Sequence, residues 1–213
     1  MKMLLSSIGL LSFLLLTGFS ALAGEKTAIP YEAPVPPPRS VFDKGRITYS
    51  SLYQGYGSFS FDHNGPTINY FMSSSRLSCM LTSPRGEGFW RGNWELMLEG
   101  IYGTVFDGPG DWIAGGTVLI RRNFIARDEK WNWYLHAGGG VIWNDIYKDQ
   151  SQTLIGRSRE FSLVAGGGLR YQINAKWSFN AELDYRHISN ADTAPRNTGL
   201  NSLGGGIGFG YTF

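Results

Sequence analysis

The sequence predicts an all-β fold, an eight-stranded antiparallel up-and-down transmembrane β-barrel. From residue 46 onward, segments alternate apolar and polar residues with a period of two, which is typical of strands with two different faces. Aromatic residues make up 15% of the chain and glycines number 29, yet the mean hydropathy is only −0.17. A barrel wall explains this combination, because half of its strand residues face lipid and half face a polar interior.

The first 23 residues have the pattern of a secretory signal peptide. Lys2 gives a basic start, an apolar run follows over 4–16, and the segment ends in Ala21-Leu22-Ala23. We therefore expect export and cleavage after Ala23. The alternative, an N-terminal membrane anchor, is disfavoured because the apolar core is too short to span a bilayer comfortably. No cysteine stands directly after the cleavage position, which argues against a lipoprotein.

Residues 24–45 are expected to form a proline-rich leader that precedes the barrel. Five prolines lie between residues 30 and 38, and proline cannot donate a hydrogen bond to a sheet ladder. The barrel domain is therefore expected over 46–213.

Eight segments carry the strand pattern. In 177–188, for example, the odd-numbered residues are mainly apolar and the even-numbered ones mainly polar. The predicted strands are 46–57, 67–82, 89–105, 112–125, 131–143, 160–173, 177–188 and 203–213. An even number of strands places both ends of the chain on the periplasmic side. The connections near 58–66, 106–111, 144–159 and 189–202 are therefore expected outside the cell, and those near 83–88, 126–130 and 174–176 in the periplasm.

The last predicted strand indicates the membrane. Ile207, Phe209, Tyr211 and Phe213 alternate with glycines and Thr212, and the sequence stops on Phe213. This ending resembles the sorting signal of outer-membrane barrels. Together with the signal peptide it predicts a multi-pass protein of the Gram-negative outer membrane.

Charged residues recur on the expected interior face of the strands, and we expect them to pair because a lone buried charge is costly. They are Glu95, Glu99, Arg170, Glu182, Asp184 and Arg186. Side chains fill an eight-stranded barrel, which disfavours a channel. The net charge of +2 gives no indication of nucleic-acid binding. Cys79 is the single cysteine and is interpreted as a small apolar strand residue.

His187 breaks the alternation, because it falls on the lipid-facing side of its strand with Leu183 and Tyr185. A titratable side chain at that position predicts a functional role. Ser189 follows two residues later on the same face, as a base and the hydroxyl that it activates require. Asn190 and Ala191 come next and are candidates for donating hydrogen bonds to an oxyanion.

The stretch from Arg186 to Ala191, followed by Asn197 and Gly199, resembles the PagL family of lipid A 3-O-deacylases. The resemblance extends upstream through 76–82, 91–95 and 121–124 and covers most of 46–213. It implies an eight-stranded outer-membrane barrel that hydrolyses the ester-linked acyl chain at the 3-position of lipid A. The site would lie on the outside of the barrel wall near the outer-leaflet surface.

By the same resemblance, Ser189 is the nucleophile, His187 the general base, and Asn190 and Ala191 the oxyanion support. No metal and no cofactor are implied. The implied partners are lipid A or lipopolysaccharide in the outer leaflet and membrane lipid. Whether the chain forms a homodimer stays open.

Asn201 departs from the family pattern, because the founding enzymes have a glutamate at the corresponding position, twelve residues after the serine. An asparagine can orient a histidine, as in papain-like proteases, but cannot supply a charge. Asp192 is the first alternative acid. The departure leaves a second hypothesis open, a non-catalytic structural or adhesive barrel on the same scaffold.

Overall fold

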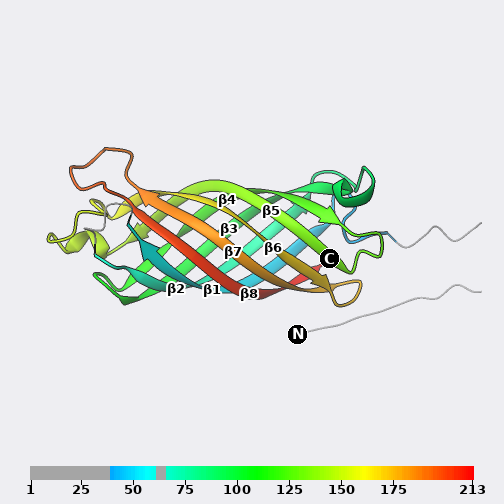
Figure 1. Ribbon diagram of the computed structural model, residues 1–213, viewed down its shortest axis with the longest axis horizontal. Helices are drawn as coiled ribbons and strands as arrows, with labels where there is room; N and C mark the ends of the chain where they lie inside the picture. The colour runs from blue at the N-terminus through cyan, green and yellow to red at the C-terminus, as the bar shows by residue number, and fades with distance from the viewer. Residues whose placement is uncertain (1–38, 61–65) are drawn as a thin grey trace, which may run out of the picture. The chain divides into compact units, whose positions relative to one another are not determined.

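The computed structural model describes residues 39–60 and 66–213, so the predicted signal peptide and residues 24–38 of the predicted leader lie outside the described residues. Eight antiparallel strands follow one another around a closed barrel, and β8 pairs back onto β1 (Figure 1). This confirms the predicted fold class. The strands are β1 Ile47–Phe59, β2 Asn69–Met80, β3 Gly92–Asp107, β4 Trp112–Ile125, β5 Trp131–Asn144, β6 Arg159–Gln172, β7 Trp177–Ser189 and β8 Leu200–Thr212.

Two strand starts differ from prediction by three residues, and the other starts agree to within two. Strand β3 begins at Gly92 because Gly88–Trp90 forms a short 3-10 helix, η1. Gly86 before this helix and Gly88 at its start have positive φ angles of 91° and 56°. Strand β8 begins at Leu200, three residues earlier than predicted, because Leu200 already pairs with Ile188 of β7. Asn201 is therefore a strand residue and not part of the preceding loop.

The barrel wall separates an apolar outside from a polar inside. On β7, Leu183 is 68% exposed, whereas its neighbours Glu182 and Asp184 are buried. Tyr53, Leu98, Leu135, Leu163 and Ile207 likewise point outward from five other strands. The wall therefore presents an apolar surface to lipid, as the period-two pattern predicts. No helix within the described residues is long and apolar enough to span a bilayer.

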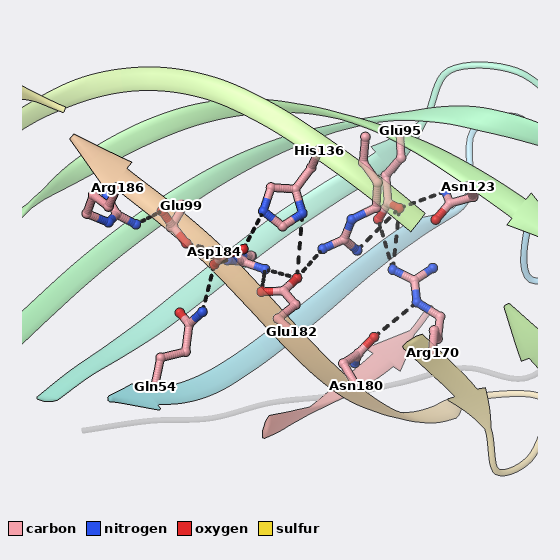
Figure 2. A network of polar contacts seen from close by, with 12 residues as sticks. Gln54, Glu95, Glu99, Asn123, His136, Arg170, Asn180, Glu182, Asp184 and Arg186 are labelled. Carbon is pink, nitrogen blue, oxygen red and sulfur yellow. Dashed lines mark hydrogen bonds and ion pairs between the residues drawn. The ribbon is translucent and has the colours of Figure 1, made fainter. Parts of the chain in front are cut away.

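A charged network fills the middle of the barrel (Figure 2). The Arg76 guanidinium lies 2.8 Å from Glu99 and 2.6 Å from Glu182. Arg121 is 2.9 Å from Glu182, and Arg186 is 3.2 Å from Glu99. Glu95 is paired with Arg121 and Arg170, and Asp184 lies 3.0 Å from His136. All six charged residues expected inside are paired, which confirms that expectation.

Apolar clusters close the interior at both ends of this network. At one end, Ile146, Leu154 and Ile155 of the β5–β6 loop are buried together with Ile188 and Leu200. This loop contains the short 3-10 helix η2, Ile146–Lys148. It lies at the same end of the barrel as the β7–β8 loop (Figure 1). The barrel core is thus filled along its length, as an eight-stranded barrel requires.

At the other end, Phe42 from the segment before β1 is fully buried beside Val41, Met80 and Ile125. Its backbone oxygen accepts a hydrogen bond from Asn93 Nδ2 at 2.5 Å. The last residues of the predicted leader therefore pack into the barrel opening, although they form no strand.

Candidate active site

Three of the predicted site residues, His187, Ser189 and Asn201, lie on the outer face of strands β7 and β8, whereas Asn190, Ala191 and Asp192 lie in the loop between these strands. His187 is paired with Leu163 on β6 and with Asn201 on β8. Ser189, two residues further along β7, is paired with Phe161. Because side chains two residues apart share a face of a strand, His187 and Ser189 both point away from the barrel interior. Leu163 and Phe161 are 59% and 52% exposed, so this face borders the lipid-facing surface.

Asn201 holds the imidazole of His187. The Nδ1 atom of His187 lies 2.8 Å from Asn201 Oδ1. A carbonyl oxygen can only accept, so Nδ1 carries a proton, and in the neutral imidazole Nε2 then keeps its lone pair. An imidazole in this tautomer can accept a proton through Nε2, as a general base must.

Tyr185 completes the contact from two residues earlier on β7. Its hydroxyl donates a hydrogen bond of 2.6 Å to the same Oδ1 of Asn201. The amide oxygen therefore receives two donors, which fixes its orientation toward the ring. Tyr185 is half-buried and its ring lies 6.2 Å from that of Phe59.

Gly199 makes room for the imidazole. A Cβ atom at this position would lie 2.7 Å from His187 Cε1, closer than real Cβ contacts occur. The φ angle of Gly199 is +81°, which L side chains rarely adopt. Both the close approach and the backbone conformation therefore require glycine here.

Ser189 Oγ makes no hydrogen bond to His187 within the described residues. Shared strand face and spacing bring the two side chains into the same neighbourhood without that contact. In hydrolases without substrate the bond between nucleophile and base is often long, and it tightens when substrate binds.

Asn190 lies on the opposite face of the chain from Ser189 and is buried. Its backbone N–H donates to Asn197 Oδ1 at 2.7 Å, and its Nδ2 donates to the Arg196 oxygen at 2.9 Å. These bonds fix the β7–β8 loop. Asn190 thus organises the chain directly after Ser189, while its own donors are engaged.

Ala191 and Asp192 form the turn that follows, with φ angles of 50° and 60°. The Ala191 N–H makes no hydrogen bond to any part of the chain that the structure describes. Asp192 is exposed, and its Oδ1 accepts a 2.7 Å hydrogen bond from Asn197 Nδ2. Asp192 therefore lies in the loop, in contact with Asn197, while Asn201 contacts His187.

Sequence reasoning gave no role to Tyr185 or Gly199. Tyr185 has the parity of His187, two residues before it, but its role depends on the pairing of β7 with β8. Gly199 stands out in the sequence only as part of the PagL-like motif. Both roles depend on which residue of β8 pairs with His187, and a single sequence does not specify this pairing.

A second group of titratable residues lies inside the barrel. His136, Glu182 and Asp184 have ligand atoms close enough for a shared cation. Arg76 and Arg121 already contact Glu182 at 2.6 and 2.9 Å. We therefore assign this group to the structural network of the interior.

Fold, surface and the family match described next together define the class of this protein: it is an outer-membrane β-barrel. A comparison with protein families matches residues 56–210 to the family described as lipid A 3-O-deacylase (PagL). The chain belongs to this family. A search of curated proteins found no match.

Among solved structures, the outer membrane enzyme PagL matches with a TM-score of 0.54 and 17% sequence identity, covering 75% of this chain and 97% of that chain. Neisserial surface protein A (NspA) matches with a TM-score of 0.55 and 12% identity, covering 78% and 97%. At these identities the two structures support the fold alone. Family membership rests on the match over 56–210.

Proposed function

We propose that this protein is an outer-membrane esterase that hydrolyses the 3-O-linked acyl chain of lipid A, with Ser189 as nucleophile and His187 as general base. The observation that carries the proposal is the contact of His187 with Asn201 on the outer surface of the barrel. A structural barrel has no need to hold an imidazole among lipid-facing residues, because polar groups there are costly. Family membership supplies the substrate class.

The reaction follows from the groups on this outer surface. His187 Nε2 accepts the proton of Ser189 Oγ as this oxygen attacks the ester carbonyl. The tetrahedral intermediate collapses when the protonated imidazole gives its proton to the departing sugar oxygen. Water, activated by the same nitrogen, then hydrolyses the acyl-serine and releases a fatty acid.

The negative charge on the intermediate needs hydrogen-bond donors close to Ser189. The Ala191 N–H is our first candidate, because it follows Ser189 closely and has no partner among the described residues. Asn190 acts as the support that fixes this turn, through its bonds to Asn197 and Arg196.

Asn201 takes the place of the family glutamate. In this proposal Asn201 selects the tautomer of His187 and holds the ring, but it supplies no negative charge to stabilise the imidazolium that forms during the reaction. Tyr185 shares the task by holding the amide. The enzyme is therefore expected to be slower than one with an acid at residue 201.

The test is mass spectrometry of lipid A from a Gram-negative strain that expresses the full chain. The wild-type protein should remove one hydroxyacyl chain, and His187→Ala and Ser189→Ala should leave lipid A intact. Ser51→Ala, which changes a serine on the outer face of β1, is the matched control and should behave as wild type. Equal deacylation by Ser189→Ala would rule out the assigned nucleophile.

The second candidate is a non-catalytic structural or adhesive barrel. The observation in its favour is the uncharged Asn201 at the acid position. An unchanged lipid A spectrum, with the folded wild-type barrel present in the outer membrane, would favour this candidate.

A further inference from the structure

A groove of about 880 Å³ lies at the outer ends of strands β5 and β6. It runs between the β5–β6 loop and the β7–β8 loop, and its lining includes Trp143, Arg157, Arg159, Phe161, Asn190 and Thr193. Phe161 is the cross-strand partner of Ser189, and Asn190 follows Ser189 in the chain. Ser189 is not itself part of the lining, but its outward-facing partner Phe161 is, so one end of the groove lies beside the proposed nucleophile.

Two arginines give the groove a positive charge. Arg157 and Arg159 are both exposed, and within the described residues neither makes a direct ion pair, although the charge of Arg157 acts on the nearby Glu160 carboxylate. An Arg157 guanidinium nitrogen donates to the backbone oxygen of Thr193, which joins the two loops. The carboxylate in the lining, Glu160, is buried, and its Oε1 accepts the N–H groups of Gly156 and Arg157 at 3.1 and 2.8 Å.

Apolar and charged groups are ordered along the strands. Arg159 is paired with Trp143, and Phe161, two residues further along β6, is paired with Ser189. With a strand rise of about 3.3 Å per residue, Arg159 lies roughly 7 Å farther from the membrane along β6 than the level of Ser189. On the membrane side of Phe161 comes Leu163, which is 59% exposed.

From the outside toward the membrane, the protein thus presents positive charge, then the proposed nucleophile, then apolar side chains. An amphiphile with its headgroup outward has the matching order of charged group, ester and hydrocarbon chain. Guanidinium groups match phosphate oxygens with paired hydrogen bonds. Aromatic surfaces such as Trp143 and Phe161, which are 48% and 52% exposed, suit the apolar face of a sugar ring. In bisphosphorylated lipid A each glucosamine carries a phosphate and a 3-linked acyl ester, so the sugar whose ester is cleaved also bears a phosphate.

We propose that the groove binds the glucosamine of lipid A whose 3-O ester is cleaved, with Arg157 and Arg159 on the phosphate of that sugar, so that the ester lies at Ser189. This inference rests on the proposed function, because it names the part of the substrate that the same site recognises. The two arginines are specificity-determining residues and take no part in the chemistry.

The experiment measures binding without turnover. The full chain carrying Ser189→Ala, folded in a neutral detergent, is titrated calorimetrically with bisphosphorylated lipid A and with lipid A that lacks the phosphate on this sugar. The same titrations are made after adding Arg157→Gln and Arg159→Gln together. The matched control is Arg127→Gln, an exposed arginine in the turn at the other end of the barrel.

The arginine pair should contribute about tenfold or more to the affinity for the bisphosphorylated lipid, as expected for charge-assisted hydrogen bonds to phosphate. The double variant should bind the two lipids alike, and Arg127→Gln should change neither. Equal affinity of the double variant and the Ser189→Ala parent for the bisphosphorylated lipid would overturn the proposal. Displacement of the lipid by inorganic phosphate at the same concentration would also overturn it, in favour of a free-anion site.

Turnover is measured separately on the wild-type chain. Absence of deacylation together with arginine-dependent lipid binding would overturn the proposed esterase while supporting the groove. Deacylation together with arginine-independent binding would support the esterase and overturn the groove. The two proposals therefore fail in different ways.

Discussion

His187 and Asn201 are direct cross-strand partners on β7 and β8, and Nδ1 of the imidazole lies 2.8 Å from Asn201 Oδ1. They are 14 residues apart in the sequence and are joined by a loop that Asn190 and Asn197 hold together. This contact fixes the tautomer of a histidine on the outer wall of a barrel. A single substitution at residue 201 should therefore test most directly how this contact affects the rate of lipid A deacylation.

Asn201→Glu should raise kcat of lipid A deacylation. A carboxylate would stabilise the imidazolium that forms when His187 takes the serine proton, and the reverse change in a serine protease costs about 10⁴-fold in kcat. We expect a rise of at least about tenfold, measured by mass spectrometry of lipid A over time. The gain should disappear when Ser189→Ala is added, and a lower kcat in Asn201→Glu would contradict the assigned role.

Tyr185→Phe should lower kcat while leaving KM unchanged. The substitution removes the 2.6 Å hydrogen bond to Asn201 Oδ1 and keeps the ring. Loss of about 1 kcal/mol of positioning corresponds to roughly a fivefold fall in kcat. Tyr53→Phe, at an outward-facing tyrosine of β1, is the control. Because Tyr185 acts only through Asn201, Tyr185→Phe should have little further effect in an Asn201→Ala background; equal losses in both backgrounds would refute this pathway.

Arg76→Met should destabilise the barrel by about 3–5 kcal/mol, because it leaves two buried carboxylates without their shared partner. Glu99 and Glu182 both contact Arg76 within 2.8 Å, and all three side chains are buried. Urea unfolding of the protein in lipid vesicles measures the effect. Leu77→Ala, on the lipid-facing side of the same strand, controls for loss of volume. Adding Glu182→Gln to Arg76→Met should recover part of the loss.

The Asp145 carboxylate should stabilise the contact between the start of β4 and the β5–β6 loop, and this stabilisation should depend on pH. Partial burial acts to raise its pKa, but hydrogen bonds from the N–H groups of Asp111 and Trp112, at 2.8 and 3.1 Å, and the charge of Lys148 outweigh it and hold the pKa below the usual 3.8. A carboxyl whose pKa is lowered on folding stabilises the folded state at neutral pH. That stabilisation is lost as the pH falls through the lowered value, below about 4.

The Asp111 and Trp112 amide resonances should therefore shift below pH 4 in the wild-type protein and stay constant in Asp145→Asn, which should lose about 1 kcal/mol of local stability at pH 7. NMR of the protein in micelles reports both. Asp128→Asn, in the turn 126–130 at the other end, is the control. A titration of these amides that persists in Asp145→Asn would show that another group causes it.

The sequence specifies the strands well, because each has to present apolar residues to lipid and polar residues to the interior. The period-two pattern of β7 therefore located the buried charges and also showed that His187 is out of place. Pairing across strands is less visible. The alternation of residues places the start of β8 three residues too late, so that Asn201 falls in a loop and Tyr185 has no predicted role.

The burial of Phe42 is likewise not predictable from the sequence pattern. The prolines between residues 30 and 38 indicate a chain that forms no strand, and nothing local indicates that an aromatic residue just beyond them fills the end of a barrel. Contacts of this kind depend on the shape of the opening that Met80 and Ile125 leave.

Closure of the sheet from β8 back to β1 bears on the alignment of His187 with Asn201. In an open sheet, an edge strand can slide by two residues and keep its faces. Here β8 is hydrogen-bonded on both sides, so such a slip would break two ladders at once and change the shear of the whole ring. The closed barrel as a whole therefore preorganises the distance between the His187 imidazole and the Asn201 amide, and the loops do not have to fix it.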